Sequence, residues 1–123
     1  MTDREAIIAY AAKMNGVPVE AMLAPVAKGY PGRHIAQAKR DAILMILAHE
    51  PGVTYIDIGR SFGLKSTTAY QYVAYAFGHD RYKHGQSGRP QFIEWGMRRY
   101  GKMLRMMAQR AIEDAATEIR HAA

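Results

Sequence analysis

The chain has 123 residues, a net charge of +6 at pH 7, 49% hydrophobic residues and no cysteine. This length and hydrophobic content fit one domain with a modest core, and the lack of cysteine excludes a disulfide framework, a cysteine zinc site and a thiol nucleophile. The positive charge favours a polyanionic partner.

Two helices that serve only to build the core are expected at the N-terminus. Thr2 or Asp3 can cap the first, and Asn15-Gly16 is typical of its end. Its inward stripe consists of Ile7, Ile8, Ala11 and Met14. Pro18 suits the first turn of the second helix, VEAML, because a proline there loses no hydrogen bond.

A basic stretch then runs from a loop broken by glycine and proline into a third helix. We expect its cations to contact phosphates or the minor groove; they are Lys28, Arg33, His34, Lys39 and Arg40. The helix should continue from Ile35 to His49, and residues 42–48 are apolar nearly all round, which predicts a central buried helix. His49-Glu50 lacks the second histidine of a zinc-protease helix, so we expect a helix end and no metal site.

Residues 54–75 have the pattern of a helix-turn-helix. Thr54 can cap a first helix that ends near Phe62, Gly59 is small where the two helices must cross, and Gly63 can adopt the positive φ that ends the helix. A second helix should begin near Lys65 or Ser66. The side chains expected to face inward are Ile58, Phe62, Leu64, Ala69, Tyr72 and Val73.

The second helix would present its first turns to the major groove, with Ala74 also facing outward. The side chains that we expect to read bases are Lys65, Ser66, Thr67, Thr68, Tyr70 and Gln71. Arg60 would hold a phosphate. An ordinary helical hairpin is the alternative, but the two glycines and the short polar helix start favour DNA binding.

The order of these features over residues 5–77 resembles the C-terminal DNA-binding domain of the bacterial chromosomal replication initiator DnaA. The segments that carry the resemblance are GVPVEAML, the basic loop, HIAQAKRDAILMILA, TYIDIGRSFG and STTAYQYV, of which IGRSFG and STT are the most specific. The resemblance implies that the loop contacts phosphates and the minor groove while the recognition helix reads the major groove. Lys65-Ser66 stands where the family has Asp-His, and the threonines that follow would touch thymine methyls. A GxxxxGK[ST] phosphate loop is missing, so we expect no nucleotide binding.

The rest of the chain is predicted to be a basic connector at 79–90 and a long amphipathic helix at 91–123. Gly88-Arg89-Pro90 resembles the core of a minor-groove AT-hook, which makes Arg89 a candidate DNA contact. In the helix a heptad seam is formed by Ile93, Met97, Tyr100, Leu104, Met107 and Ala111. This seam either packs on the chain's own domain or forms a homodimer interface. The arginines around it either extend the DNA footprint or form a solvated face.

These observations predict an all-α protein with a helix-turn-helix domain of about five helices at 1–78, followed by the connector and the long helix. The expected function is binding of double-stranded DNA, as a transcriptional or replication-linked regulator of bacterial or phage origin. The alternative is an adaptor that binds another protein through its Met-rich C-terminal helix. We expect no enzyme activity, because none of the 11 acidic residues pairs with a histidine or a second acid for acid–base work. Nor do we expect a cofactor, membrane association or a location other than the cytoplasm.

Overall fold

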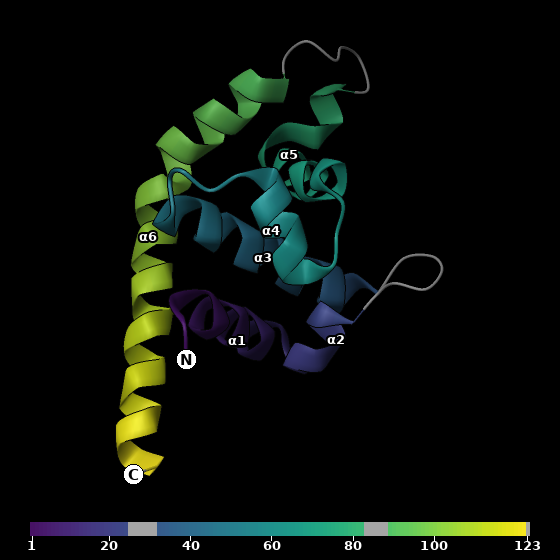
Figure 1. Ribbon diagram of the computed structural model, residues 1–123. Helices are drawn as coiled ribbons and strands as arrows, with labels where there is room; N and C mark the ends of the chain where they lie inside the picture. Colours follow the sequence, from purple (N-terminus) through teal and green to yellow (C-terminus); the bar gives the residue numbers. More distant parts are fainter. Residues whose placement is uncertain (25–31, 83–88, 123) are drawn as a thin grey trace.

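The computed structural model describes residues 1–24, 32–82 and 89–122, and within these ranges the chain forms six α-helices and no strand (Figure 1). Side chains are described except at 78–82, 89–92 and 121–122. The helices are α1 (Asp3–Asn15), α2 (Val19–Leu23), α3 (Arg33–His49), α4 (Tyr55–Phe62), α5 (Ser66–Tyr82) and α6 (Arg89–Ala122). The prediction of an all-α fold that ends in a long helix is confirmed. Helices α5 and α6 both extend into the segment predicted as a connector.

Helix α1 has the ends that the sequence predicted. The Thr2 hydroxyl accepts a hydrogen bond from the Glu5 backbone N–H at 3.1 Å, and the Glu5 carboxylate accepts one from the Thr2 N–H at 3.0 Å. This capping box satisfies two backbone donors that the first turn leaves unpaired. Gly16 ends the helix with a φ of 64°, a conformation that glycine adopts without a steric penalty.

Helix α3 is the centre of the molecule, as the apolar run in its sequence predicted. It contacts each of the other five described helices, and all its residues from Ala42 to Ile46 are buried. It crosses the domain, with its start beside α2 and its end against α6 (Figure 1). The Glu50 N–H closes the last turn on the Ile46 carbonyl at 2.8 Å.

Helix α6 lies along one side of the domain, where it packs on α1, α3 and α5 (Figure 1). Leu104, Ala108 and Ala111 are buried in the common core, and Ile93, Met97 and Met107 pack against it. Of the two roles open for the heptad seam, packing on the chain's own domain is therefore the one observed. Leu104 and Ala111 face the chain's own core and are not accessible to a second chain, which corrects their assignment to a dimer interface. Ile93, Met97 and Met107 are partly buried against the same core, whereas Tyr100 is 38% exposed. A dimer contact by these four side chains stays a prediction.

The N-terminal part of α6 is held to α5 by aromatic packing. The Phe77 ring stacks on Tyr100, with centroids 6.1 Å apart and ring planes 2° from parallel. Phe77 also lies directly on the backbone at Gly96, where a Cβ atom would overlap its ring. Glycine at residue 96 is thus required for the close approach of α5 and α6.

Candidate nucleic-acid interface

Helices α4 and α5 form the predicted helix-turn-helix, joined by the three residues Gly63, Leu64 and Lys65. The Thr54 hydroxyl caps α4 by accepting the Asp57 N–H at 3.1 Å, and Gly63 ends α4 with a φ of 65°. Both predictions are confirmed. The prediction that α5 begins near Lys65 or Ser66 is also confirmed, since its first residue is Ser66.

Gly59 is needed for a reason that differs slightly from the predicted helix crossing. The Leu64 N–H bonds to the Gly59 carbonyl at 2.8 Å, which brings the turn back over α4. A Cβ atom at residue 59 would collide with the Leu64 carbonyl oxygen. The close contact is therefore with the backbone of the turn and not with a side chain of α5.

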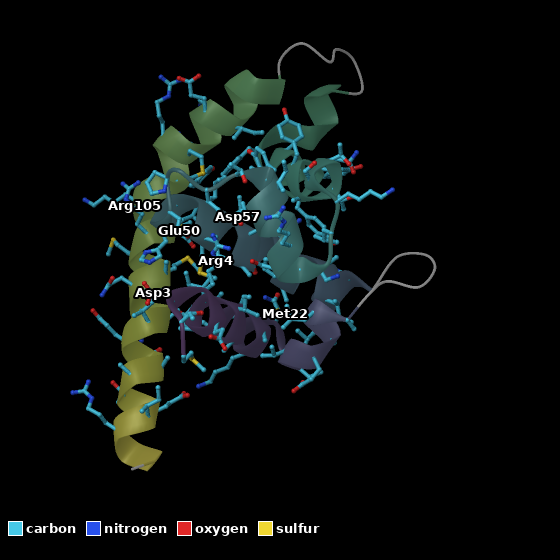
Figure 2. All side chains as sticks on the ribbon, in the orientation of Figure 1. Asp3, Arg4, Met22, Glu50, Asp57 and Arg105 are labelled. Carbon is cyan, nitrogen blue, oxygen red and sulfur yellow. The ribbon has the colours of Figure 1, made fainter. Side chains whose placement is uncertain are left out.

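An ionic network fixes α4 to the rest of the domain. The Arg4 guanidinium on α1 donates to both carboxylate oxygens of Glu50, at 2.7 and 2.8 Å, to Asp57 on α4 at 3.2 Å and to the Ser61 hydroxyl at 3.2 Å. Figure 2 shows Arg4, Glu50 and Asp57 close together between the end of α3 and the face of α4. The hydrogen bond from Arg4 holds the pKa of the Glu50 carboxyl below its usual range. The network is not predictable from the sequence, because its members are far apart along the chain.

The first turns of α3 and α5 face each other across an open groove of about 600 Å³. This α3–α5 groove is lined by Arg33, Ala36, Gln37, Arg40, Thr68, Gln71, Tyr72 and Tyr75. Two guanidinium groups and two polar side chains of the proposed recognition helix thus share one surface, and no acidic side chain is among the lining residues. Guanidinium groups bind phosphate, whereas threonine and glutamine can bind base edges.

The structure brings together four of the predicted contact residues, namely Arg33, Arg40, Thr68 and Gln71. Others are exposed but are not among the lining residues of the groove: His34 on α3, Arg60 on α4, Lys65 in the turn and Thr67 on α5. Ser66, at the start of α5, is half-buried. Lys28 lies outside the described residues, and Arg89 lies where α6 begins, in a part whose side chains are not described.

Lys39 does not have the predicted role, and this assignment was wrong. Its side chain is fully buried, and its Nζ atom has no hydrogen-bond partner among the described residues. Lys39 and Arg40 are adjacent on α3 and point in directions about 100° apart around the helix axis, so Lys39 can face the core while Arg40 lines the groove. Burial lowers the pKa of the Lys39 ammonium because the charged form loses its hydration.

Tyr70 is half-buried and packs edge-on against the Tyr55 ring, with centroids 5.2 Å apart, so it braces α5 against α4. Its contact with DNA stays a prediction. The prediction for Ala74 needs correction. Ala74 is buried, not outward. The reason is that α5 contacts α3, α4 and α6, which enclose more of its surface than the two-helix unit alone would.

Sequence reasoning overlooked Gln37 and Tyr75 as groove residues. Gln37 lies four residues after Arg33 and three before Arg40, and Tyr75 lies four residues after Gln71. Residues three and four apart share a helix face, so this spacing contained the signal.

Two kinds of feature are not found in the part of the chain that the structure describes: a cluster of metal ligands and a membrane-spanning helix. In residues 1–24, 32–82 and 89–122 there is no cluster of three histidine or acidic side chains placed to hold a metal ion. Within the same ranges no helix combines the length and apolar character needed to cross a bilayer. Comparisons of the chain with known protein families, curated proteins and solved structures gave no match.

Proposed function

We propose that this protein binds double-stranded DNA, with the start of α5 in the major groove and the start of α3 on the adjoining backbone. The observation that carries the proposal is the α3–α5 groove, where Arg33 and Arg40 meet Thr68 and Gln71 without an acidic neighbour in the lining. The charge of the whole chain is +6, which favours approach to a polyanion.

Each side chain of the groove has a distinct part in this proposal. Gln71 can form two hydrogen bonds with the edge of an adenine, and the Thr68 methyl can contact a thymine methyl. Arg33 and Arg40 bind phosphate oxygens, which sets the position of α5 on the duplex. Lys65 and Arg60, both exposed, extend the phosphate contact around the start of α5.

The framework of the site supports the proposal because several contacts hold the recognition helix to the rest of the domain. Thr54 and Gly63 define the ends of α4, and the Arg4 network ties α4 to α1 and to the end of α3. Tyr55 and Tyr70 join α4 to α5. A recognition helix fixed in this way loses little conformational freedom when it binds.

The likeness of residues 5–77 to the DnaA C-terminal domain extends the proposal to a regulator of transcription or replication. The replacement of the family's Asp-His by Lys65-Ser66 implies a target sequence different from that of the family. Selection of genomic DNA fragments by the purified protein, followed by sequencing of the retained fragments, identifies this target.

A salt titration on the selected duplex tests the proposal. If about five cationic side chains neutralise phosphates, the logarithm of the affinity falls with the logarithm of the salt concentration at a slope of roughly −4 to −5. No binding to any duplex at low salt would contradict the proposal. That result would instead favour an adaptor that uses the exposed Met103 and Met106 of α6 to bind another protein.

A further inference from the structure

The outward side of α6 carries a second concentration of positive charge, remote from the α3–α5 groove. We define the outer basic face as five exposed side chains, namely Arg98, Arg99, Lys102, Arg105 and Arg110. The sequence has no acidic residue between Glu94 and Glu113. None of the five cations forms an ion pair among the residues that the structure describes.

The fold does not need this face. Leu104, Ala108 and Ala111 bind α6 to the core from its opposite side, whereas Arg105 points away from the domain (Figure 2). Exposed hydrophobic side chains lie among the cations: Trp95 is 46% and Met106 is 65% exposed. A face that is both cationic and partly apolar, and that stays exposed in the part of the chain that the structure describes, is a candidate binding surface.

One of the guanidinium groups is already held in place. The Arg99 guanidinium lies 5.8 Å from the centre of the Trp95 ring and 5.7 Å from that of Tyr100, and its Nε donates to the Tyr100 hydroxyl at 3.3 Å. Such contacts with aromatic rings restrict the side chain while leaving its charge available. Arg99 therefore loses less entropy on binding an anion than a free arginine would.

The spacing of the cations fits a nucleic-acid backbone. With a rise of about 1.5 Å per residue, Arg98 and Arg110 are about 18 Å apart along the helix axis, a length over which a duplex carries about ten phosphate charges. Four of the five cations are arginines, whose planar group matches a phosphate in two hydrogen bonds. A polyanion with regular phosphates complements this face better than a single anion does.

The two cationic surfaces lie at opposite ends of α3. The groove includes Arg33 at the start of α3, whereas α6 lies against the end of α3, on the other side of the domain (Figure 1). A DNA duplex is stiff over about 150 base pairs, so one short duplex does not wrap around a domain of this size to reach both surfaces. A duplex held in the groove leaves the outer basic face free for another.

We propose that the outer basic face binds the backbone of a second DNA duplex, so that one chain bridges two DNA segments. The bridge rests on the proposed function, because the first duplex occupies the α3–α5 groove. Binding at the outer basic face would be insensitive to sequence, since its cations contact phosphates.

The test uses bead-bound duplex, a free fluorescent duplex and four forms of the full chain. They are the wild type, a face variant (Lys102→Gln with Arg105→Gln), a groove variant (Arg33→Gln with Arg40→Gln), and a control that loses the same charge at exposed residues elsewhere (Lys13→Gln with Arg120→Gln). Affinity for one duplex is measured alongside capture of the second duplex by the beads. Thermal unfolding verifies that each form is folded.

The face variant should bind one duplex within about threefold of the wild type yet capture about tenfold less of the second, because two of five phosphate contacts are lost. The groove variant should also lose capture but retain binding of one duplex, and combining both pairs of changes should weaken that remaining binding about tenfold. The control should match the wild type.

Equal capture by the face variant and the wild type would overturn the bridging proposal while leaving DNA binding through the groove intact. The proposal would also be overturned if the groove variant and the variant that combines both pairs of changes bound duplex equally well. Anionic phospholipid vesicles form a separate arm: a groove variant that binds vesicles and no duplex would assign the face to a lipid surface and overturn the proposal. If the wild type binds no duplex at all, the proposed function itself fails.

Discussion

The guanidinium of Arg4 donates hydrogen bonds to both carboxylate oxygens of Glu50, at 2.7 and 2.8 Å, and so joins the first turn of α1 to the C-cap of α3. The same guanidinium reaches Asp57 in the first turn of α4. Three helices that carry or support the α3–α5 groove are thus fixed by one cation. The pair is about two-thirds buried, with 27% of the Arg4 side chain and 33% of the Glu50 side chain exposed.

Replacing Arg4 by Met should lower the free energy of unfolding by about 1–2 kcal/mol, because Glu50 and Asp57 lose a partner while partly withdrawn from water. Urea denaturation measures the change. Arg120→Met is the matched control, because that arginine is exposed near the end of α6 and should alter stability by less than about 0.5 kcal/mol. Equal effects of the two substitutions would show that the network does not stabilise the fold.

The Glu50 carboxyl should make stability depend on acid pH. Its hydrogen bond with Arg4 lowers its pKa in the folded state below the usual 4.5, so the ionised form is favoured by folding. The stabilisation is complete above pH 4.5 and is lost as the pH falls through the lowered pKa, since the unfolded chain then binds more protons. Thermal midpoints between pH 3 and pH 6 should therefore fall less steeply in Glu50→Gln than in the wild type. Identical slopes would contradict this role.

Gly96→Ala should destabilise the protein by about 1–3 kcal/mol, because the added methyl overlaps the Phe77 ring and forces α5 and α6 apart. Gly101→Ala is an informative control, also on α6. There a Cβ atom would meet only the end of the flexible Arg105 side chain, at 3.2 Å, and the change should be neutral or stabilising by up to about 1 kcal/mol. Chemical denaturation compares the two, and similar losses would mean that Phe77 does not require glycine at residue 96.

Lys39→Met should raise stability at pH 7 by about 1–3 kcal/mol, since it removes a buried ammonium that has no hydrogen-bond partner in the described chain and keeps a similar volume. Because the pKa of Lys39 is lowered in the folded state, the cost of its burial shrinks as the pH rises towards 10.5. The advantage of the variant should therefore be larger at pH 7 than at pH 10. Lys102→Met, at an exposed residue, provides the baseline, and a gain in stability that does not change with pH would contradict the account.

The same variant tests the corrected role of Lys39. A buried lysine cannot contact phosphate in the folded protein, so Lys39→Met should leave duplex affinity within about twofold, whereas loss of a phosphate contact also changes the salt slope by about one unit. Fluorescence anisotropy on the selected duplex measures both quantities. If Lys39→Met bound the duplex more weakly and with a shallower salt slope than the wild type, Lys39 would be a phosphate contact after all.

Local features of this fold were predictable because their causes lie within a few residues. Thr2 and Thr54 cap helices α1 and α4, as expected. Gly16 and Gly63 adopt the expected positive φ, because each directly follows the last residue of a helix. The central helix was predictable as well, since a run of apolar side chains on all sides has few alternatives to full burial.

Features that depend on distant parts of the chain were not predictable. A heptad seam indicates that α6 packs on an apolar surface, but it does not indicate whether that surface belongs to a second chain or to α1, α3 and α5. The burial of Lys39 next to the accessible Arg40 depends on how the other helices pack around α3. Phe77 and Gly96 give no sign in the sequence that they touch.

The most direct test of the central claim, that the α3–α5 groove reads duplex DNA, compares variant affinities on the selected duplex and on random duplex. Gln71→Ala should cost roughly 1–3 kcal/mol on the selected duplex and little on random DNA, whereas Arg33→Ala should weaken both about equally. Thr117→Ala, on the exposed part of α6, should change neither. If Gln71→Ala weakens both duplexes equally, or neither, then α5 does not read bases and the account of this groove is wrong.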